Sequence, residues 1–233
     1  MKTIKIGMSG WTGFAPLTLA EKAGLFEQQG VKVETVFISQ KDRLAALAAG
    51  SVDAVATTVD TQILWATSVP LTQVLLLDKS NGGDGVAVRK EIEGFEGLKG
   101  KTIACDAAGT TPYFMLAAFL KENGMSIKDV KLSTLSPKDA ANAFVAGQFD
   151  AAATYEPYLS TIRNDPDAGK ILATTKDYPV VVDTLAFPTE GLEAHSETIH
   201  KIVAGWFSAL EMIKSSPEEA YGIMGEKVNQ TAE

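Results

Sequence analysis

The stretch "AAGSVDAVATT" (Ala48–Thr58) recurs later in the chain as "VAGQFDAAATY" (Val145–Tyr155). The two copies share Ala-Gly, two variable residues, Asp-Ala, one variable residue and Ala-Thr. Their aspartates differ in number by 150 − 53 = 97. A period this long indicates two duplicated lobes rather than a solenoid of short repeats.

A second echo lies upstream, where "KTIKIGMSGWTGFAPLTLA" (Lys2–Ala20) resembles "KTIACDAAGTTPYFMLA" (Lys101–Ala117). Each copy reads as a β-branched strand, a glycine loop, a helix opened by proline, a second strand, a second helix and a third strand. The β-α-β-α-β order predicts right-handed crossovers. The expected fold class is therefore α/β, with each lobe a mainly parallel sheet flanked by helices.

Extended crossings near Val86–Lys90 and Val181–Phe187 divide the chain. We expect residues 1–86 and 187–233 to form lobe 1, and residues 87–186 to form lobe 2. The C-terminal segment is helical throughout, and an apolar stripe at helical spacing predicts core positions; it comprises Ile199, Val203, Trp206, Phe207 and Leu210. Two such lobes make a hinged cleft, and ligands of these sheets bind at the carboxyl ends of the strands.

Composition excludes several classes of function. The 233 residues are 45% hydrophobic and 21% charged, which is typical of a globular protein, and the formal net charge is −8. That charge argues against a nucleic acid partner or an anionic membrane surface. Cys105 is the only cysteine of the sequence, so no internal disulfide or thiolate metal cluster can form.

The order of several longer phrases resembles a known family. The phrases are "GWTGFAPLTLAEKAGLFEQQGVKVE" (Gly10–Glu34), "LAAGSVDAVATT" (Leu47–Thr58), "FEGLKGKTIACDAAGTTPYFMLAAFLKENG" (Phe95–Gly124) and "AAATYEPYLS" (Ala151–Ser160). They resemble the solute-binding proteins of ABC importers for nitrate, taurine, aliphatic sulfonates and thiamine-pyrimidine precursors. The resemblance covers nearly the whole chain.

The resemblance implies a periplasmic-binding-protein (Venus-flytrap) fold that closes on its ligand by hinge bending. It also implies an ABC importer permease as partner, a periplasmic or lipid-anchored location, no catalysis and no cofactor or metal. We expect a monomer. The chain opens on a strand without a secretory signal, so we expect the leader or anchor to lie outside it. Such receptors usually run longer, so C-terminal helices are expected to be missing or short.

Carried over by position, the resemblance places the ligand against loops that precede helices. Their backbone N–H groups and helix dipoles suit an anionic group. Gly13 and Thr111 also fit a plain turn and cap before proline, and Trp11 fits either ligand stacking or a packed loop. The expected ligand-binding residues are Gly10, Trp11, Thr12, Gly13, Thr58, Asp60, Asp106, Gly109, Thr110, Thr111, Glu156 and Asp183.

The acidic members of this set favour a ligand that carries a cation. Asp60, Asp106 and Asp183 fall at strand ends, and no lysine or arginine accompanies them in the same phrases. A buried ammonium would pair with such carboxylates, whereas nitrate or bicarbonate would fit poorly. The sequence therefore predicts a small amine-bearing or zwitterionic solute of the taurine or sulfonate kind. Asp106 as a loop cap and Asp183 as a backbone acceptor at the hinge remain open alternatives.

Other functions remain as alternatives. A neutral pyrimidine or thiamine precursor could use Asp106 and Asp183 for N–H contacts and Trp11 for stacking. An enzyme of the same fold is disfavoured, because Cys105 is at a buried strand end and "GMSGW" lacks the second glycine of a serine elbow. The effector domain of a transcription regulator also has two such lobes. Asp53 and Asp150 are interpreted as structural, accepting turn N–H groups.

Overall fold

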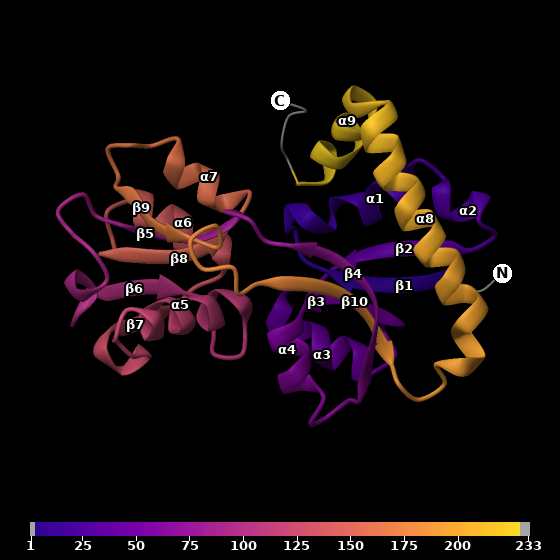
Figure 1. Ribbon diagram of the computed structural model, residues 1–233, viewed down its shortest axis with the longest axis horizontal. Coiled ribbons are helices and arrows are strands. Elements are labelled where there is room, and N and C mark those ends of the chain that lie inside the picture. Colours follow the sequence, from indigo (N-terminus) through magenta and orange to yellow (C-terminus); the bar gives the residue numbers. More distant parts are fainter. Residues whose placement is uncertain (1–2, 229–233) are drawn as a thin grey trace. The chain divides into compact units, whose positions relative to one another are not determined.

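The chain folds as two compact units. A computed structural model describes residues 3–228, with side chains to residue 225. Unit 1 comprises Met1–Asp78 with Asp183–Glu233, and unit 2 comprises Lys79–Val182. Each unit is a five-stranded sheet flanked by helices (Figure 1). The two-lobe α/β architecture predicted from the repeated phrases is confirmed.

The sheet of unit 1 has the strand order β2-β1-β3-β10-β4. Its centre is parallel, because β1 pairs with β2 and β3 in parallel. The fourth strand, β10, is antiparallel to β3 and comes from beyond unit 2. The strands are β1 (Thr3–Met8), β2 (Lys32–Phe37), β3 (Ala54–Thr58), β4 (Leu71–Lys79) and β10 (Val182–Pro188). The predicted second crossing, Val181–Phe187, thus lies largely in β10.

Local sequence explains these elements. All five residues of β3 are buried, as its continuous apolar and threonine run predicts. Pro16 lies in the first turn of α1, where its missing N–H costs no hydrogen bond. Gly50 follows α3 with a φ of 67°, and Gly147 follows α6 with a φ of 82°. This left-handed backbone favours glycine, which explains why both copies of the phrase keep it.

The C-terminal helix α8 packs against the first helices of the chain. Trp206 is 2% exposed, as predicted, but Phe207 is 54% exposed, so its assignment to the core was wrong. The buried side of α8 follows Ile199, Ile202 and Trp206, and Phe207 lies one residue, about 100°, away from it. The helices of unit 1 are α1 (Ala15–Lys22), α2 (Leu25–Gln28), α3 (Gln40–Ala48), α4 (Val59–Trp65), α8 (Ser196–Ser215) and α9 (Pro217–Val228).

Unit 2 repeats this plan with the strand order β7-β6-β8-β5-β9. β6 pairs in parallel with β7 and β8, and β5 is antiparallel to β8. The predicted first crossing, Val86–Lys90, lies in β5 and the turn after it. The elements are β5 (Asp84–Val88), β6 (Thr102–Cys105), α5 (Thr111–Glu122), β7 (Lys131–Thr134), α6 (Pro137–Val145), β8 (Ala151–Tyr155), α7 (Tyr158–Arg163) and β9 (Lys170–Thr174).

The duplication extends to individual hydrogen bonds. The carboxylate of Asp53 accepts from the backbone N–H of Lys5 at 2.9 Å. In unit 2, Asp150 accepts from the backbone N–H of Thr102 at 2.7 Å. Both pairs are shifted by the 97 positions of the repeat (150 − 53 and 102 − 5). Each carboxylate ties the first strand of its unit to the turn before the third, which confirms the structural role predicted for both aspartates.

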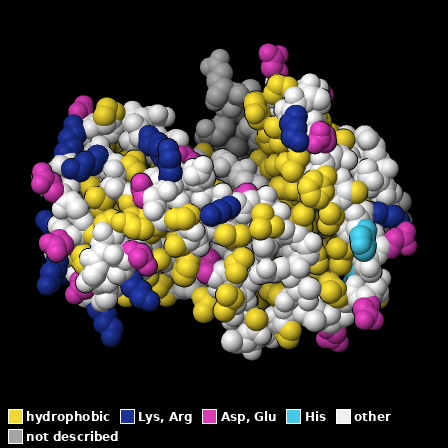
Figure 2. All heavy atoms as spheres, viewed as in Figure 1, with side chains coloured by type: hydrophobic (Ala, Val, Ile, Leu, Met, Phe, Trp, Pro, Cys, Tyr) yellow, Lys and Arg dark blue, Asp and Glu magenta, His cyan; other side chains and the backbone are white. Residues whose placement is uncertain are grey.

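The surface carries basic, acidic and apolar side chains. On the face in Figure 2, lysine and arginine side chains lie dispersed among acidic ones. Exposed large apolar side chains include Ile63 and Leu64 on α4 and Leu76 on β4. Within residues 3–228, no helix combines the length and the apolar character that a membrane crossing needs.

Candidate functional site

The predicted site residues of unit 1 lie at one edge of its sheet. Gly10–Gly13 follow β1, and Thr58 ends β3 just before Asp60 on α4. Asp183, at the start of β10, pairs with Thr58 across the sheet. Because β10 runs antiparallel, its first residues lie beside the carboxyl end of β3. The fold therefore brings residues that are more than a hundred positions apart to the edge where the parallel strands end.

Trp11 is held by a residue that the sequence prediction missed. Its indole Nε1–H donates to Asp78 Oδ2 at 3.0 Å, and the Trp11 side chain is 9% exposed. Asp78 lies near the end of β4. Gly13 packs against this hydrogen bond so closely that an added Cβ would lie 1.9 Å from Asp78 Oδ2 and 2.3 Å from Trp11 Nε1. Gly13 is required here by close approach, not by its backbone angles.

Burial disfavours the ionised form of two carboxyl groups at this edge. Burial raises the pKa of Asp78, and hydrogen bonds with Trp11 and Asp183 offset this only in part. Burial also raises the pKa of Asp60, against the opposing effect of hydrogen bonds from Thr58 and Thr61. No neighbouring cation contributes to either shift. A cation brought to this edge would stabilise the ionised form of both groups.

Hydroxyl groups organise the turn between β3 and α4. Thr61 Oγ1 accepts from Gln40 Nε2 at 2.6 Å and from Thr58 Oγ1 at 2.9 Å. Its own proton is directed to Asp60 Oδ2 at 3.4 Å. Gln40 opens α3, so this network ties the loops after β2 and β3 together. Thr58, predicted to contact ligand, is only 5% exposed.

Four of the predicted residues of unit 2, Asp106, Gly109, Thr110 and Thr111, lie in the loop between β6 and α5 or at the start of α5. Asp106 Oδ1 accepts from the backbone N–H of Ala107 at 2.7 Å. The Thr110 hydroxyl donates to the Ala107 carbonyl at 2.8 Å. Gly109 has a φ of 89°, and Thr111 opens α5. Asp106 therefore shapes its own loop, which is one of the two roles that the sequence left open.

Glu156, the last predicted residue, has a basic neighbour that the sequence analysis overlooked. Its Oε1 lies 3.3 Å from Arg163 Nε, and its Oε2 accepts from the backbone N–H of Ser160 at 2.9 Å. The two contacts fix the first turns of α7. Arg163 lies seven residues further along the chain (163 − 156), outside the "TYEP" phrase that contains Glu156.

Asp84 is a second acidic residue that the sequence analysis missed. It is 2% exposed, begins β5 and pairs with Tyr155 of β8. Asp183 occupies the same place in unit 1, since Thr58 and Tyr155 differ by the repeat offset of 97 (155 − 58). Each unit thus begins its antiparallel strand with a buried aspartate. The signal in the sequence was an aspartate flanking an apolar strand, but "NGGDG" reads more simply as a glycine turn.

The cysteine has no chemical role that its surroundings favour. Cys105 is 1% exposed, and burial, helped by the charge of Asp106, raises the pKa of its thiol to about 12. A nucleophilic cysteine needs an accessible thiolate. Among residues that the structure describes, no three His, Cys, Asp or Glu side chains are grouped so that they could hold a metal ion.

Comparison with known proteins gives a consistent family. The family model described as "NMT1-like family" matches residues 1–224. A Brucella abortus (strain 2308) protein with the name "Putative binding protein" is 24% identical over 225 residues, 94% of this chain and 70% of its own length. The "Putative aliphatic sulfonates-binding protein" of Bacillus subtilis (strain 168) is 33% identical over 168 residues, 69% of this chain and 50% of its own.

Solved structures support the fold. The alkanesulfonate-binding protein SsuA from Xanthomonas axonopodis pv. citri, bound to MOPS, has a TM-score of 0.85 at 22% identity and covers 99% of this chain and 80% of its own. A desulfurization enzyme shares the fold at a TM-score of 0.69 and 12% identity, covering 100% of this chain and 82% of its own. Likeness at these identities establishes the periplasmic-binding-protein fold alone.

Proposed function

The chain belongs to the NMT1-like family, and from that premise we propose that it is an extracytoplasmic solute-binding receptor of an ABC importer. Its ligand is a small amine-bearing or zwitterionic organic solute of the taurine or sulfonate kind. The predicted interlobe cleft, the permease partner, the periplasmic or lipid-anchored location and the monomeric state belong to this proposal. The names of the sulfonate-binding relatives support its class of ligand.

The acidic edge of the unit 1 sheet is the observation that supports a cationic group on the solute. Asp78 and Asp183 hydrogen bond with each other, and Trp11 donates to Asp78. Two carboxyl groups can share a hydrogen bond only while one of them is protonated. An ammonium group offers several donors and a full charge, so it can replace that proton and satisfy both oxygens. Asp60 supplies a third carboxylate to the same edge.

The anionic part of the solute is assigned to the loop before α5. Gly109, Thr110 and Thr111 lead directly into this twelve-residue helix. A helix N-terminus carries partial positive charge and backbone donors, and threonine hydroxyls can add more. A solute with a sulfonate or carboxylate at one end and an ammonium at the other would satisfy both kinds of group. An inorganic anion would satisfy only one.

The decisive experiment identifies the native ligand. Protein purified without refolding is denatured, and the released small molecules are identified by mass spectrometry. We expect a solute that bears an amine. An inorganic anion, or an organic acid without a basic nitrogen, would overturn the cationic assignment and leave the receptor class intact.

Calorimetry with that ligand then tests the residues. Asp183→Asn and Asp60→Asn should weaken binding roughly ten- to hundredfold, since a charge-assisted hydrogen bond contributes about 1.5 to 3 kcal/mol. Asp167→Asn is the matched control, because the side chain of Asp167 is 97% exposed and pairs with Lys90 on the surface. Equal affinity in all three variants would disprove the acidic-site argument.

A neutral pyrimidine is the second candidate. The raised pKa of Asp78 favours it, because a protonated carboxyl can donate to a ring nitrogen while the neighbouring one accepts from a ring N–H. The predicted stacking on Trp11 would require more of the indole than its 9% exposure offers in this structure. Ligand identification separates the two candidates directly.

The receptor proposal also excludes turnover. An enzyme of this fold needs a reactive side chain at the site, and the buried Cys105 thiol, with a pKa of about 12, does not provide one. The ligand recovered after prolonged incubation with purified protein should be chemically unchanged. Steady appearance of a product would show that the protein is an enzyme and would contradict the receptor proposal.

A further inference from the structure

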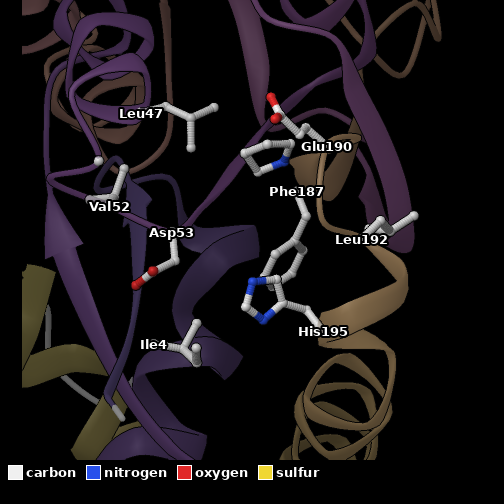
Figure 3. A pocket seen from close by; sticks show the side chains of 10 residues that line it. Ile4, Leu47, Val52, Asp53, Phe187, Glu190, Leu192 and His195 are labelled. Carbon is white, nitrogen blue, oxygen red and sulfur yellow. The ribbon is translucent and has the colours of Figure 1, made fainter.

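A cavity lies at the opposite edge of the unit 1 sheet. It has a volume of about 190 Å³. Ile4 lies at the start of β1 and Asp53 just before β3, so the cavity is at the amino ends of the parallel strands, away from Trp11 and Asp183. Figure 3 shows its walls, which are formed by Ile4, Leu47, Gly50, Val52, Asp53, Phe187, Pro188, Glu190, Leu192 and His195.

The duplication supplies a counterpart for this place in unit 2. Leu47 and Val52 correspond to Phe144 and Phe149, each shifted by 97. The turns match in detail, since Gly50 N–H donates to the Leu47 carbonyl at 3.0 Å and the equivalent bond to Phe144 is 2.9 Å. The two regions therefore have the same backbone frame.

The antiparallel strands extend the correspondence. Asp183 in β10 and Asp84 in β5 occupy equivalent places, opposite Thr58 and Tyr155 respectively. Five residues after each aspartate stand Pro188 (183 + 5) and Arg89 (84 + 5). Pro188 of unit 1 is thus the counterpart of Arg89 of unit 2.

Arg89 fills the equivalent place in unit 2. Its Nε donates to the Phe149 carbonyl at 2.9 Å, and its Nη2 donates to the carbonyl of Phe144. The guanidinium carbon lies 4.1 Å from the centre of the Phe144 ring. The Arg89 charge also acts on Asp150 and adds to the hydrogen bonds from Thr102 that lower the pKa of this carboxyl. In unit 2, a guanidinium group of the protein itself therefore fills the place that corresponds to the cavity of unit 1.

Unit 1 has proline at that position, with neither a guanidinium group nor a backbone N–H. In unit 2, Phe144, Phe149 and Asp150 surround the Arg89 guanidinium group. Their counterparts in unit 1 line an open cavity instead; they are Leu47, Val52 and Asp53. Glu190 adds a further carboxylate to the wall. From this difference we infer that the cavity is a binding site for a small organic cation, a guanidinium group on a short apolar stem, supplied from solution.

The walls suit both parts of such a ligand. Guanidinium is planar and weakly hydrated, so it can stack on an aromatic ring while it donates to carbonyl and carboxylate oxygens. The ring of Phe187 and the side chains of Ile4 and Leu192 can cover the stem. A volume of about 190 Å³ corresponds to roughly six water molecules, which matches a compound with a four-carbon stem.

Butylguanidinium is the probe, and neutral butylurea, of nearly the same shape, is its control. In an amide NMR titration at millimolar concentration, butylguanidinium should shift the signals of residues 50–53 and 187–195, and butylurea should not. Equal shifts with both probes, or none with butylguanidinium, would overturn the proposal. The Asp183→Asn variant should respond as the parent does, which separates this site from the proposed solute site.

Variants test the correspondence with Arg89. Pro188→Arg should supply the guanidinium internally and weaken butylguanidinium binding roughly tenfold or more, whereas Pro188→Ala leaves the cavity open and should bind as the parent does. Glu190→Gln alters only an exposed side chain and should weaken binding roughly threefold. If Pro188→Arg does not fold, the Glu190→Gln result decides. Unchanged affinity in every folded variant would refute the site.

Discussion

Trp11 and Asp78, from opposite ends of the first half of unit 1, are joined by a 3.0 Å hydrogen bond that rests on Gly13. The bond links the loop after β1 to the end of β4, beside the start of β10. It holds the indole in the sheet edge and directs one carboxylate oxygen away from solvent. The geometry of the proposed solute site therefore depends on the absence of a side chain at Gly13.

Replacing Gly13 with alanine should disrupt this link. The added Cβ would lie 1.9 Å from Asp78 Oδ2, so the loop must move. We expect a loss of about 1 to 3 kcal/mol of stability, as for other overpacked positions, together with a change in tryptophan emission. Thermal and urea unfolding measure the loss. Gly222→Ala is the control, because nothing lies within 4 Å of its added Cβ, and it should be neutral or stabilising.

Solute binding should depend on pH in a defined direction. Burial raises the pKa of Asp60 and Asp78, and a bound ammonium would lower both values again. Binding therefore releases protons near the raised pKa, and affinity should increase as the pH rises from about 4 and level off above that pKa. Calorimetry in two buffers of different ionisation enthalpy measures the proton release. A ligand that binds without proton exchange across this range would contradict the ammonium assignment.

Gly205 should be as intolerant of a side chain as Gly13. It lies on the buried side of α8, where an added Cβ would come within 2.4 Å of Phe26 Cδ1. Gly205→Ala should cost about 1 to 3 kcal/mol through displacement of α8 from α2, despite the higher helix propensity of alanine. The double variant Gly205→Ala with Phe26→Leu should recover part of the loss. If the loss in the double variant equals the sum of the losses in the two single variants, the two residues do not act through this contact.

Cys105 should report unfolding. With a pKa of about 12 and 1% exposure, its thiol is neither ionised nor accessible in the native protein near neutral pH. A thiol reagent at pH 8 should react with the native protein many times more slowly than with protein in denaturant. Fast reaction without denaturant would show that the end of β6 opens locally.

Asp150 should stabilise unit 2 in a pH-dependent way. Hydrogen bonds from Thr102 hold its pKa below the usual value. Its contribution is therefore complete above the unfolded pKa of about 3.9 and is lost as the pH falls through the lower folded value. Asp150→Ala should cost about 1 kcal/mol at pH 7, after allowance for the exposure of the carboxylate. The same loss at pH 2 would contradict the role of the charge.

The repeated phrase predicted the fold because it is a local signal. Strands, crossover helices and helix-ending glycines such as Gly50 and Gly147 each depend on a few neighbouring residues. Strand pairing between distant segments does not depend on neighbouring residues. The site residues that were not predicted owe their neighbours to this pairing. The antiparallel strand β10 brings Asp183 next to Thr58 and Asp78. No local sequence pattern predicts the place of β10 in the sheet.

The predicted site residues follow the same division. The loops after β1, β3 and β6 were expected at the carboxyl ends of strands, and the structure has them there. The partners of their side chains were not predictable, because each partner lies outside the phrase that contains the predicted residue. Trp11 donates to Asp78, and Glu156 pairs with Arg163. Whether these loops contact a solute stays a prediction.

The late strand β10, which completes the sheet of unit 1, also sets an order of events during synthesis. Unit 2 is one continuous segment, Lys79–Val182, so every strand of its sheet has been made once residue 182 leaves the ribosome. Unit 1 still lacks β10, which separates β3 from β4, and β4 has no neighbour until that strand arrives. The half of the protein that is translated first must therefore wait for the half translated second. A chain interrupted before Asp183 would present an incomplete first sheet to chaperones and proteases beside a finished second one.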